Sequence, residues 1–133
     1  MAKIFNMSEA TQIAIHAIVL LARNPEAPLT TKQISEGISS SENHLSKVMQ
    51  RLVKSEFVGS TRGPSGGFYL QTNSDCITLY DIYETIEGKL TSNKCPFDKK
   101  QCFFAKCVFD NKIHEISNDF VEYLKNTKIS ERI

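Results

Sequence analysis

The feature that most restricts the fold of this chain is a glycine-rich turn between two short extended runs. Residues 62–67 read Arg-Gly-Pro-Ser-Gly-Gly, and they separate an alternating run over 57–61 from a second run over 68–70. Glycine and proline clustered in this way break regular structure and favour turns. Alternating side chains on either side of a turn are typical of paired strands. The segment therefore predicts a β-hairpin.

Two helical patterns come first in the chain. Ser8 is a predicted N-cap, and the helix that follows must stop before Asn24-Pro25. Its apolar residues recur at helical spacing: Ala10, Ile13, Ala14, Ala17, Ile18 and Leu21. Thr30 or Thr31 is expected to cap a short second helix. Gly37 is expected to end that helix, since glycine tolerates the left-handed conformation found after helix ends.

A third helix is predicted between the second helix and the hairpin. One of the serines at 39–41 would cap it, and its polar faces carry residues such as Gln50 and Arg51. Its apolar face follows helical spacing: Leu45, Val48, Met49 and Leu52. Two helices joined by a tight turn and followed by a hairpin predict a mainly α winged helix-turn-helix. In this fold the third helix enters a major groove and the wing contacts the adjoining backbone or minor groove.

The rest of the chain predicts a short helix, a loop and a long helix. The short helix is capped by Thr78 and ended by Gly88, and the loop runs over 90–106. The closing segment has apolar residues spaced by three or four: Phe109, Ile113, Ile116, Phe120 and Leu124. That stripe is typical of a helix that packs against another helix. Little chain is left to cover it, so we expect a second subunit, and a homodimer would span two operator half-sites.

Composition sets the domain organisation and the compartment. With 133 residues and 41% hydrophobic residues, the chain has about one domain's worth of core. We expect a winged helix-turn-helix over 1–75 and a short helix, cysteine loop and dimerisation helix over 76–133. No stretch approaches the roughly 20 apolar residues that cross a bilayer, and residues 1–6 resemble no signal peptide. The expectation is a cytoplasmic protein that does not contact a membrane.

The charge balance restricts how the chain could bind DNA. It has 16 basic and 15 acidic residues, a net charge of +1, so any DNA contact must come from a local patch. The predicted base readers lie in the first turns of the third helix: Ser41, Asn43, His44 and Lys47. Asparagine can pair with adenine, and lysine can contact guanine or a phosphate. Arg62, beside wing glycines, suits a narrow minor groove. The alternative for these residues is a solvated polar face.

Three cysteines lie close together in the predicted loop and directly after it. Cys95, Cys102 and Cys107 fall within 13 positions, among several lysines that would lower thiol pKa values. Their irregular spacing differs from the paired knuckles of structural zinc sites, so an iron-sulfur cluster is favoured over zinc, with free thiols as the remaining alternative. Cys76, at the base of the wing, is expected to be a small buried apolar side chain.

Three cysteines leave one ligand position open. Asp110 and His114 are expected to share a face of the final helix with Cys107. Another set lies on one face of the first helix: Glu9, Gln12 and His16. We take His16 as the possible fourth ligand, and the alternative is a core or interface histidine with a satisfied hydrogen bond.

The third-helix string Ser41 to Leu52, the wing from Arg62 to Phe68 and the three-cysteine loop together resemble the Rrf-two family of winged-helix transcription regulators. The resemblance covers essentially the whole chain. It implies a homodimer, a 2Fe-2S or 4Fe-4S cluster on the three loop cysteines, and DNA binding that depends on the cluster. The nitric-oxide-sensing branch takes an acidic ligand from the first helix of the partner subunit. An ungapped alignment puts Gln12 at that position, with His16 one turn further on.

These observations together predict a DNA-binding transcriptional regulator, and specifically a repressor of a palindromic operator. Its cluster would sense nitric oxide, redox stress or iron-sulfur status. The alternative is an iron-sulfur or zinc carrier without operator-specific binding. Asn43, Lys47 and Arg62 on one exposed surface favour the regulator. No nucleophile–base pair is recognisable, so the chain is not expected to be an enzyme.

Overall fold

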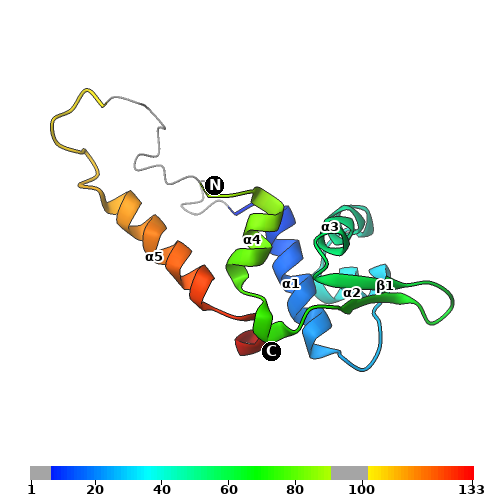
Figure 1. Cartoon of the computed structure of the whole chain (residues 1–133). Coiled ribbons are helices and arrows are strands. Elements are labelled where there is room, and N and C mark those ends of the chain that lie inside the picture. The colour runs from blue at the N-terminus through cyan, green and yellow to red at the C-terminus, as the bar shows by residue number, and fades with distance from the viewer. Residues whose placement is uncertain (1–6, 91–101) are drawn as a thin grey trace.

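The computed structural model describes residues 7–90 and 102–133. This part of the chain is mainly helical and carries one two-stranded antiparallel sheet (Figure 1). Its elements are, in order, α1 (Glu9–Arg23), α2 (Thr31–Ile38), α3 (Glu42–Lys54), β1 (Val58–Thr61), β2 (Gly67–Leu70), the 3-10 helix η1 (Ser74–Cys76), α4 (Leu79–Glu87), α5 (Lys112–Asn126) and the 3-10 helix η2 (Ile129–Arg132).

Helix α1 is the centre of the core. The Ser8 hydroxyl accepts a hydrogen bond from the Thr11 backbone N–H, which satisfies one of the free donors at the start of the helix. Its apolar stripe is buried: Ile13, Ala14, Ala17, Ile18 and Leu21. These residues pack with side chains of α2, α3 and α4 in one cluster. The predicted cap and bounds of this helix are confirmed.

Helix α2 extends two residues beyond the end that its sequence suggests. Thr30 caps it in a capping box with Gln33, as predicted for this threonine pair. The prediction that Gly37 ends the helix is wrong, because the helix continues to Ile38 and Ser39 takes the left-handed conformation at φ 55°. Gly37 instead makes room for α1, since a Cβ there would lie 2.9 Å from Leu20 Cδ2.

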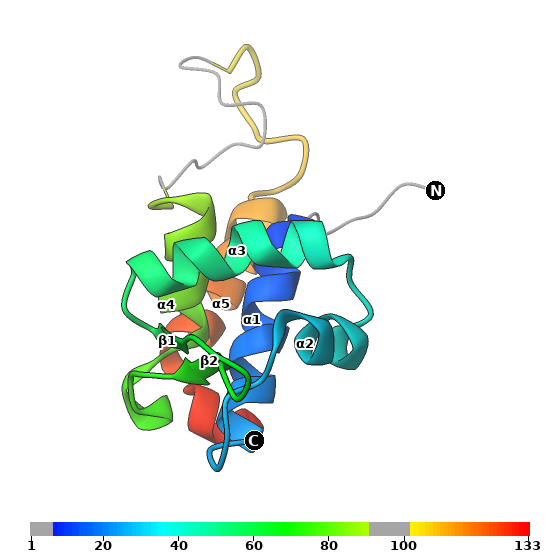
Figure 2. The same cartoon turned by 90° about the vertical axis from the view of Figure 1, so that its right-hand side faces the viewer.

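The hairpin forms as predicted and is fixed to the body of the protein. In the antiparallel register Val58 lies opposite Leu70. Phe68 also exchanges two backbone hydrogen bonds with Leu29, of 2.9 and 2.8 Å, in the connection between α1 and α2. Gly67 permits this close approach, because a Cβ there would lie 2.5 Å from the Leu29 carbonyl oxygen. Figure 2 shows the hairpin beside α2, below α3.

The second half of the chain closes the core. Thr78 caps α4 in a capping box with Asp81, and Gly88 ends the helix with φ 87°. The segment after α5 lies beside the start of α4, where Leu79 N–H donates to Thr127 O at 3.0 Å. The core cluster accordingly includes residues from both sides of residue 75, among them Ile77, Ile82, Leu124 and Ile129.

The final helix begins later than its apolar stripe indicates. Asp110 and Asn111 have φ angles of 52° and 60°, and α5 begins only at Lys112. Two consecutive left-handed residues interrupt the helical path. The prediction that Cys107, Asp110 and His114 share one helical face is therefore wrong, because the first two precede the helix.

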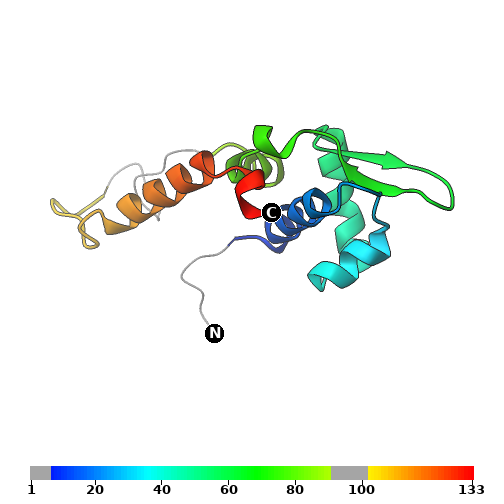
Figure 3. The same ribbon diagram turned by 90° about the horizontal axis from the view of Figure 1, so that it is seen from below.

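The two ends of the molecule carry different features. Figures 1 and 3 show the wing and α2 at one end, and the start of α5 at the opposite end. Residues 102–110, which lead into α5, are all exposed. Within the described ranges, no helix is both long and apolar enough to span a bilayer.

Candidate DNA interface and cysteine site

Helix α3 presents a polar surface because its apolar face is used by the core. Leu45, Val48, Met49 and Leu52 are buried, so Asn43 and Lys47 are left exposed on the outer face. Ser41 is the serine that caps the helix, and its hydroxyl accepts from the His44 backbone N–H at 3.2 Å. The cap fixes the first turn, which is the part of a recognition helix that approaches base edges.

His44 differs from its neighbours because it faces α1. Its Nδ1 lies 3.7 Å from the Glu9 carboxylate, and its side chain is 36% exposed. Sequence reasoning placed Glu9 among possible metal ligands and did not connect it to the third helix. The structure thus brings an acidic group beside a predicted DNA contact.

The wing presents Arg62 at its tip. Arg62 directly follows β1 and is exposed. Gly63, with φ 100°, and Gly66 close the turn through a 3.0 Å hydrogen bond from Gly66 N–H to Gly63 O. A small, glycine-lined tip lets the arginine and the backbone approach a groove closely. The bridge from Phe68 to Leu29 attaches this tip to the helix-turn-helix.

Arg51 is exposed, but its guanidinium reaches the last turn of α4. Its guanidinium donates to two backbone carbonyls in the last turn of α4, Ile86 O at 2.7 Å and Thr85 O at 3.1 Å. These carbonyls are free because a helix end leaves its last acceptors unpaired. No spacing in the sequence indicates this contact, because Arg51 lies one turn after Lys47 on the polar side of α3.

The same turn of α4 is tied to α1. The Glu87 carboxylate accepts hydrogen bonds from the hydroxyls of Ser8 and Thr11. These hydrogen bonds, aided by the nearby Arg51 charge, lower the pKa of Glu87 below its ordinary value of 4.5. Helices α1, α3 and α4 are therefore connected at one point, directly before the chain enters the cysteine segment.

The cysteines are only partly described by the structure. Cys95 lies outside the described residues, whereas Cys102 and Cys107 are exposed free thiols. The prediction that Cys76 is buried is wrong, because η1 leaves its thiol exposed. Across residues 7–90 and 102–133, no three Cys, His, Asp or Glu side chains gather as a metal site. Any site that uses the loop cysteines needs ligands from beyond this part of one chain.

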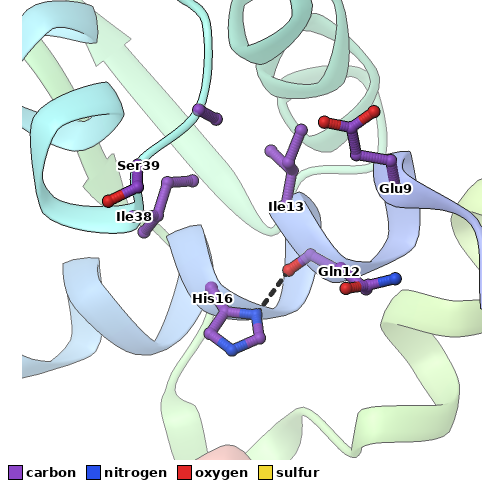
Figure 4. A pocket seen from close by; sticks show the side chains of 7 residues that line it. Glu9, Gln12, Ile13, His16, Ile38 and Ser39 are labelled. Atoms are coloured by element: carbon purple, nitrogen blue, oxygen red, sulfur yellow. Dashed lines mark hydrogen bonds between the residues drawn. The ribbon is translucent and has the colours of Figure 1, made fainter.

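The polar face of α1 borders a pocket of about 310 Å³. Glu9, Gln12 and His16 line one side, and the turn between α2 and α3, including Ser39 and Ser40, lines the other (Figure 4). Ser40 Oγ is buried and has no hydrogen-bond partner within the described part of the chain. The pocket therefore joins the predicted ligand face to the turn of the helix-turn-helix.

His16 is exposed on this face, so it is not a core histidine. Its Nδ1 lies 2.6 Å from the Gln12 carbonyl oxygen. A carbonyl can only accept, so Nδ1 carries the proton and the Nε2 lone pair of the neutral ring points away from α1. Metal-binding histidines commonly donate their other ring nitrogen to a carbonyl in this way. By comparison, His114 Nε2 lies 3.2 Å from the Asn118 amide nitrogen and is already engaged.

A capped recognition helix, a preceding helix joined by a tight turn, and a glycine-tipped hairpin define a winged-helix DNA-binding protein. The chain belongs to the Rrf2 family, described as iron-dependent transcriptional regulators, whose family model matches residues 7–132. That family is one of transcriptional regulators.

Similar proteins agree with this assignment. A candidate HTH-type transcriptional regulator of Aquifex aeolicus is 30% identical over 129 residues, which cover 95% of this chain and 90% of the relative. The chain spans about half the length of two other curated relatives that it matches. IscR of T. potens shares the fold with a TM-score of 0.75 and 24% identity, over 96% of this chain and 85% of that one. CymR, the global cysteine regulator of B. subtilis, does so with a TM-score of 0.74 and 23% identity, over 96% and 95%.

Proposed function

We propose that this regulator is a cytoplasmic homodimeric repressor whose binding to a palindromic operator is controlled by an iron-sulfur cluster. The loop cysteines Cys95, Cys102 and Cys107 would hold the cluster, and His16 of the partner subunit would supply the fourth ligand. Residues 1–75 would form the reading head, and residues 76–133 would carry the sensing and dimerisation functions.

The observation that carries this proposal is the pair of exposed free thiols at Cys102 and Cys107, at the opposite end of the molecule from the wing. Exposed thiols in a lysine-rich segment suit thiolate ligation of iron. The family description as iron-dependent regulators agrees with that chemistry. When bound, the cluster supplies a centre that reacts with oxidants or nitric oxide.

Two features support a ligand from the partner subunit. The His16 imidazole has an outward Nε2 lone pair, fixed by the hydrogen bond to Gln12 O. Helix α1 lies in the body, whereas the segment with Cys102 and Cys107 leads into the far end of α5 (Figure 1). A second copy could bring that segment to the pocket beside His16. The cluster would then connect the two subunits.

Exposed apolar side chains support the homodimer. On α5, Ile113, Ile116 and Tyr123 are 37%, 48% and 47% exposed. A mostly apolar groove of about 530 Å³ lies on the body between α1, α2 and α4, and Ile15, Val19 and Leu20 contribute to its lining. Apolar surface of this kind is typical of protein interfaces. We assign both surfaces to a second copy of the chain.

The proposed DNA contacts lie on the exposed end of the reading head. Asn43 and Lys47 would contact base edges or phosphates, with Ser41 and His44 beside them in the first turn of α3. Arg62 would enter the adjoining minor groove. A two-fold dimer presents two such heads, which suits a palindromic operator with half-sites about 34 Å apart.

The test is anaerobic purification followed by iron and sulfide analysis and a visible spectrum. The wild-type protein should contain both elements, and Cys95→Ala, Cys102→Ala and Cys107→Ala should each abolish the cluster. Cys76→Ala is the matched control, because this thiol is also exposed but lies in η1, outside the cysteine segment. Zinc, or empty thiols, in the wild-type protein would contradict the proposal.

A second measurement separates a regulator controlled by a cluster from a carrier. DNA duplexes are first selected from a randomised pool by the holoprotein. The protein should bind these duplexes less tightly after the cluster is removed. The expected loss exceeds the roughly 1–3 kcal/mol of a single base contact, while binding to unrelated duplexes changes much less. A holoprotein that selects no sequence would support the carrier instead.

A further inference from the structure

We propose that Arg51 is a positioning residue through which the cysteine segment controls the orientation of the recognition helix. This inference rests on the proposed function of the cluster. One side chain of α3 would connect that helix to the last turn of α4.

The contacts of Arg51 determine which parts of the fold move together. Its guanidinium donates to Ile86 O at 2.7 Å and to Thr85 O at 3.1 Å. Both hydrogen bonds come from one guanidinium nitrogen, Nη2, whose two hydrogens lie in the plane of the group. A cation is also favourable at the C-terminal end of a helix dipole. A rotation of the last turn of α4 would therefore carry the second half of α3 with it.

The last turn of α4 is also where the cysteine segment departs. Gly88 ends the helix through a 2.8 Å hydrogen bond to Glu84 O, and Cys95 follows in the same connection to α5. On the other side of the turn, Glu87 accepts from Ser8 and Thr11 of α1. Helix α1 thus provides a fixed point, and Arg51 transmits a change at the end of α4 to α3.

The geometry distinguishes this role from a DNA contact. Asn43 and Lys47 are exposed near the start of α3, whereas Arg51 is nearer its end and is occupied by α4 carbonyls. Its Nη2 is occupied by these two carbonyls, a structural contact that a phosphate-binding role would not require. Lys54, one turn further along and also exposed, provides a matched control with the same charge and helix.

The first experiment measures the salt dependence of DNA binding. Each phosphate contact contributes about 0.9 to the slope of log K against log salt concentration. With a duplex selected by wild-type holoprotein, Arg51→Ala should weaken binding and leave this slope unchanged, whereas Lys47→Ala should lower it. A slope lowered by about 0.9 in Arg51→Ala would make Arg51 a phosphate contact and overturn the inference.

The second experiment measures affinity with and without the cluster. We expect the wild-type ratio of holo to cluster-free affinity to be on the order of tenfold or more. In Arg51→Ala the ratio should approach one, with iron and sulfide content unchanged. Lys54→Ala should keep the wild-type ratio. An unchanged ratio in Arg51→Ala, or equal ratios in both variants, would overturn the inference.

The possible failures are distinguishable. Wild-type protein whose two forms bind DNA equally would overturn the proposed cluster control, and this inference with it. A wild-type ratio that survives in Arg51→Ala would overturn the positioning role alone. If Arg51→Ala does not fold, Arg51→Lys keeps the charge on a shorter side chain that reaches the α4 carbonyls less well. Its affinity ratio should fall between the wild-type ratio and one. A wild-type ratio in folded Arg51→Lys would count against the inference.

Discussion

Glu9, the first residue of α1, lies 3.7 Å from His44 on the recognition helix. The two side chains come from helices that sequence reasoning assigned to different tasks, one to metal binding and one to DNA. Their contact places a negative charge beside a surface proposed to bind a polyanion. It also holds His44 towards α1 and away from the outer face of α3.

Glu9→Gln should therefore tighten DNA binding. The carboxylate repels phosphates and competes with them for the imidazole, but both side chains are partly exposed and such pairs are weak. We expect about a two- to fourfold gain in affinity, equivalent to under ~1 kcal/mol, and a smaller gain at high salt. Fluorescence anisotropy at two salt concentrations would measure it. In Glu9→Gln/His44→Ala the gain should shrink. Weaker binding by Glu9→Gln would contradict this interpretation.

His16→Ala should make the proposed cluster labile and shift its visible spectrum, because one ligand would be replaced by solvent. The measurement is the anaerobic decay of the visible absorbance after purification. His114→Ala is the control, since its ring already contacts Asn118. An unchanged lifetime and spectrum in His16→Ala would remove this residue from the site and leave Asp110 or His114 as candidates.

Glu87→Gln should destabilise the cluster-free protein in a pH-dependent manner. The pKa of Glu87 is lower in the folded protein, because the ionised form accepts hydrogen bonds from Ser8 and Thr11. Its stabilisation is therefore fully present above the ordinary pKa of 4.5 and is lost as the pH falls through the folded pKa. We expect a cost of roughly 1 kcal/mol at pH 7, reduced by solvent screening.

Urea unfolding of both proteins from pH 7 down to pH 3 would measure this cost. The difference between wild type and Glu87→Gln should narrow towards pH 3. Glu84→Gln, in the same helix and with the same change in charge, should show no matching trend. A difference that is constant with pH would show that the hydrogen-bonded carboxylate is not its source.

Ile116→Glu should dissociate the proposed dimer. This side chain is 48% exposed on α5, and burying a charge in an apolar interface is costly. Sedimentation velocity should show a monomer. Its binding to a two-site duplex should be much weaker than that of the wild-type dimer and no tighter per site than its binding to a duplex with a single half-site. Asn126→Glu adds the same charge at the end of the helix and should remain dimeric. A dimeric Ile116→Glu would move the interface elsewhere.

Local sequence signals predicted most of the fold. Ser8, Thr30, Ser41 and Thr78 cap helices as expected, because a hydroxyl that accepts from a nearby backbone N–H is a short-range effect. The glycine-rich turn also acts over a short range in the sequence, and it forms the wing as predicted. The errors arose where packing decided the outcome. Gly37 lies inside α2 against Leu20, and Ser39 takes the left-handed position at the helix end.

The candidate site was less predictable because its contacts join distant segments. No spacing rule connects Arg51 to Thr85, or Glu9 to His44. Cys76 is exposed because η1 lies on the surface. The apolar character of a cysteine side chain does not predict that position. His16 was identifiable as a possible ligand from its helical register with Gln12, but the hydrogen bond that fixes its tautomer required the structure.

The hydrogen bonds that pair residues 77–79 with residues 127–129 have a consequence for how this fold can diversify. The chain leaves the body through α4 and returns at an adjacent point, with Leu79 bonded to Thr127 and Ile129 to Ile77. Changing the length of a connection between fixed ends costs little free energy. Insertions, deletions or new ligand sets between Gly88 and the start of α5 at Lys112 can therefore accumulate without displacing the core. One reading head can in this way be combined with many different sensors.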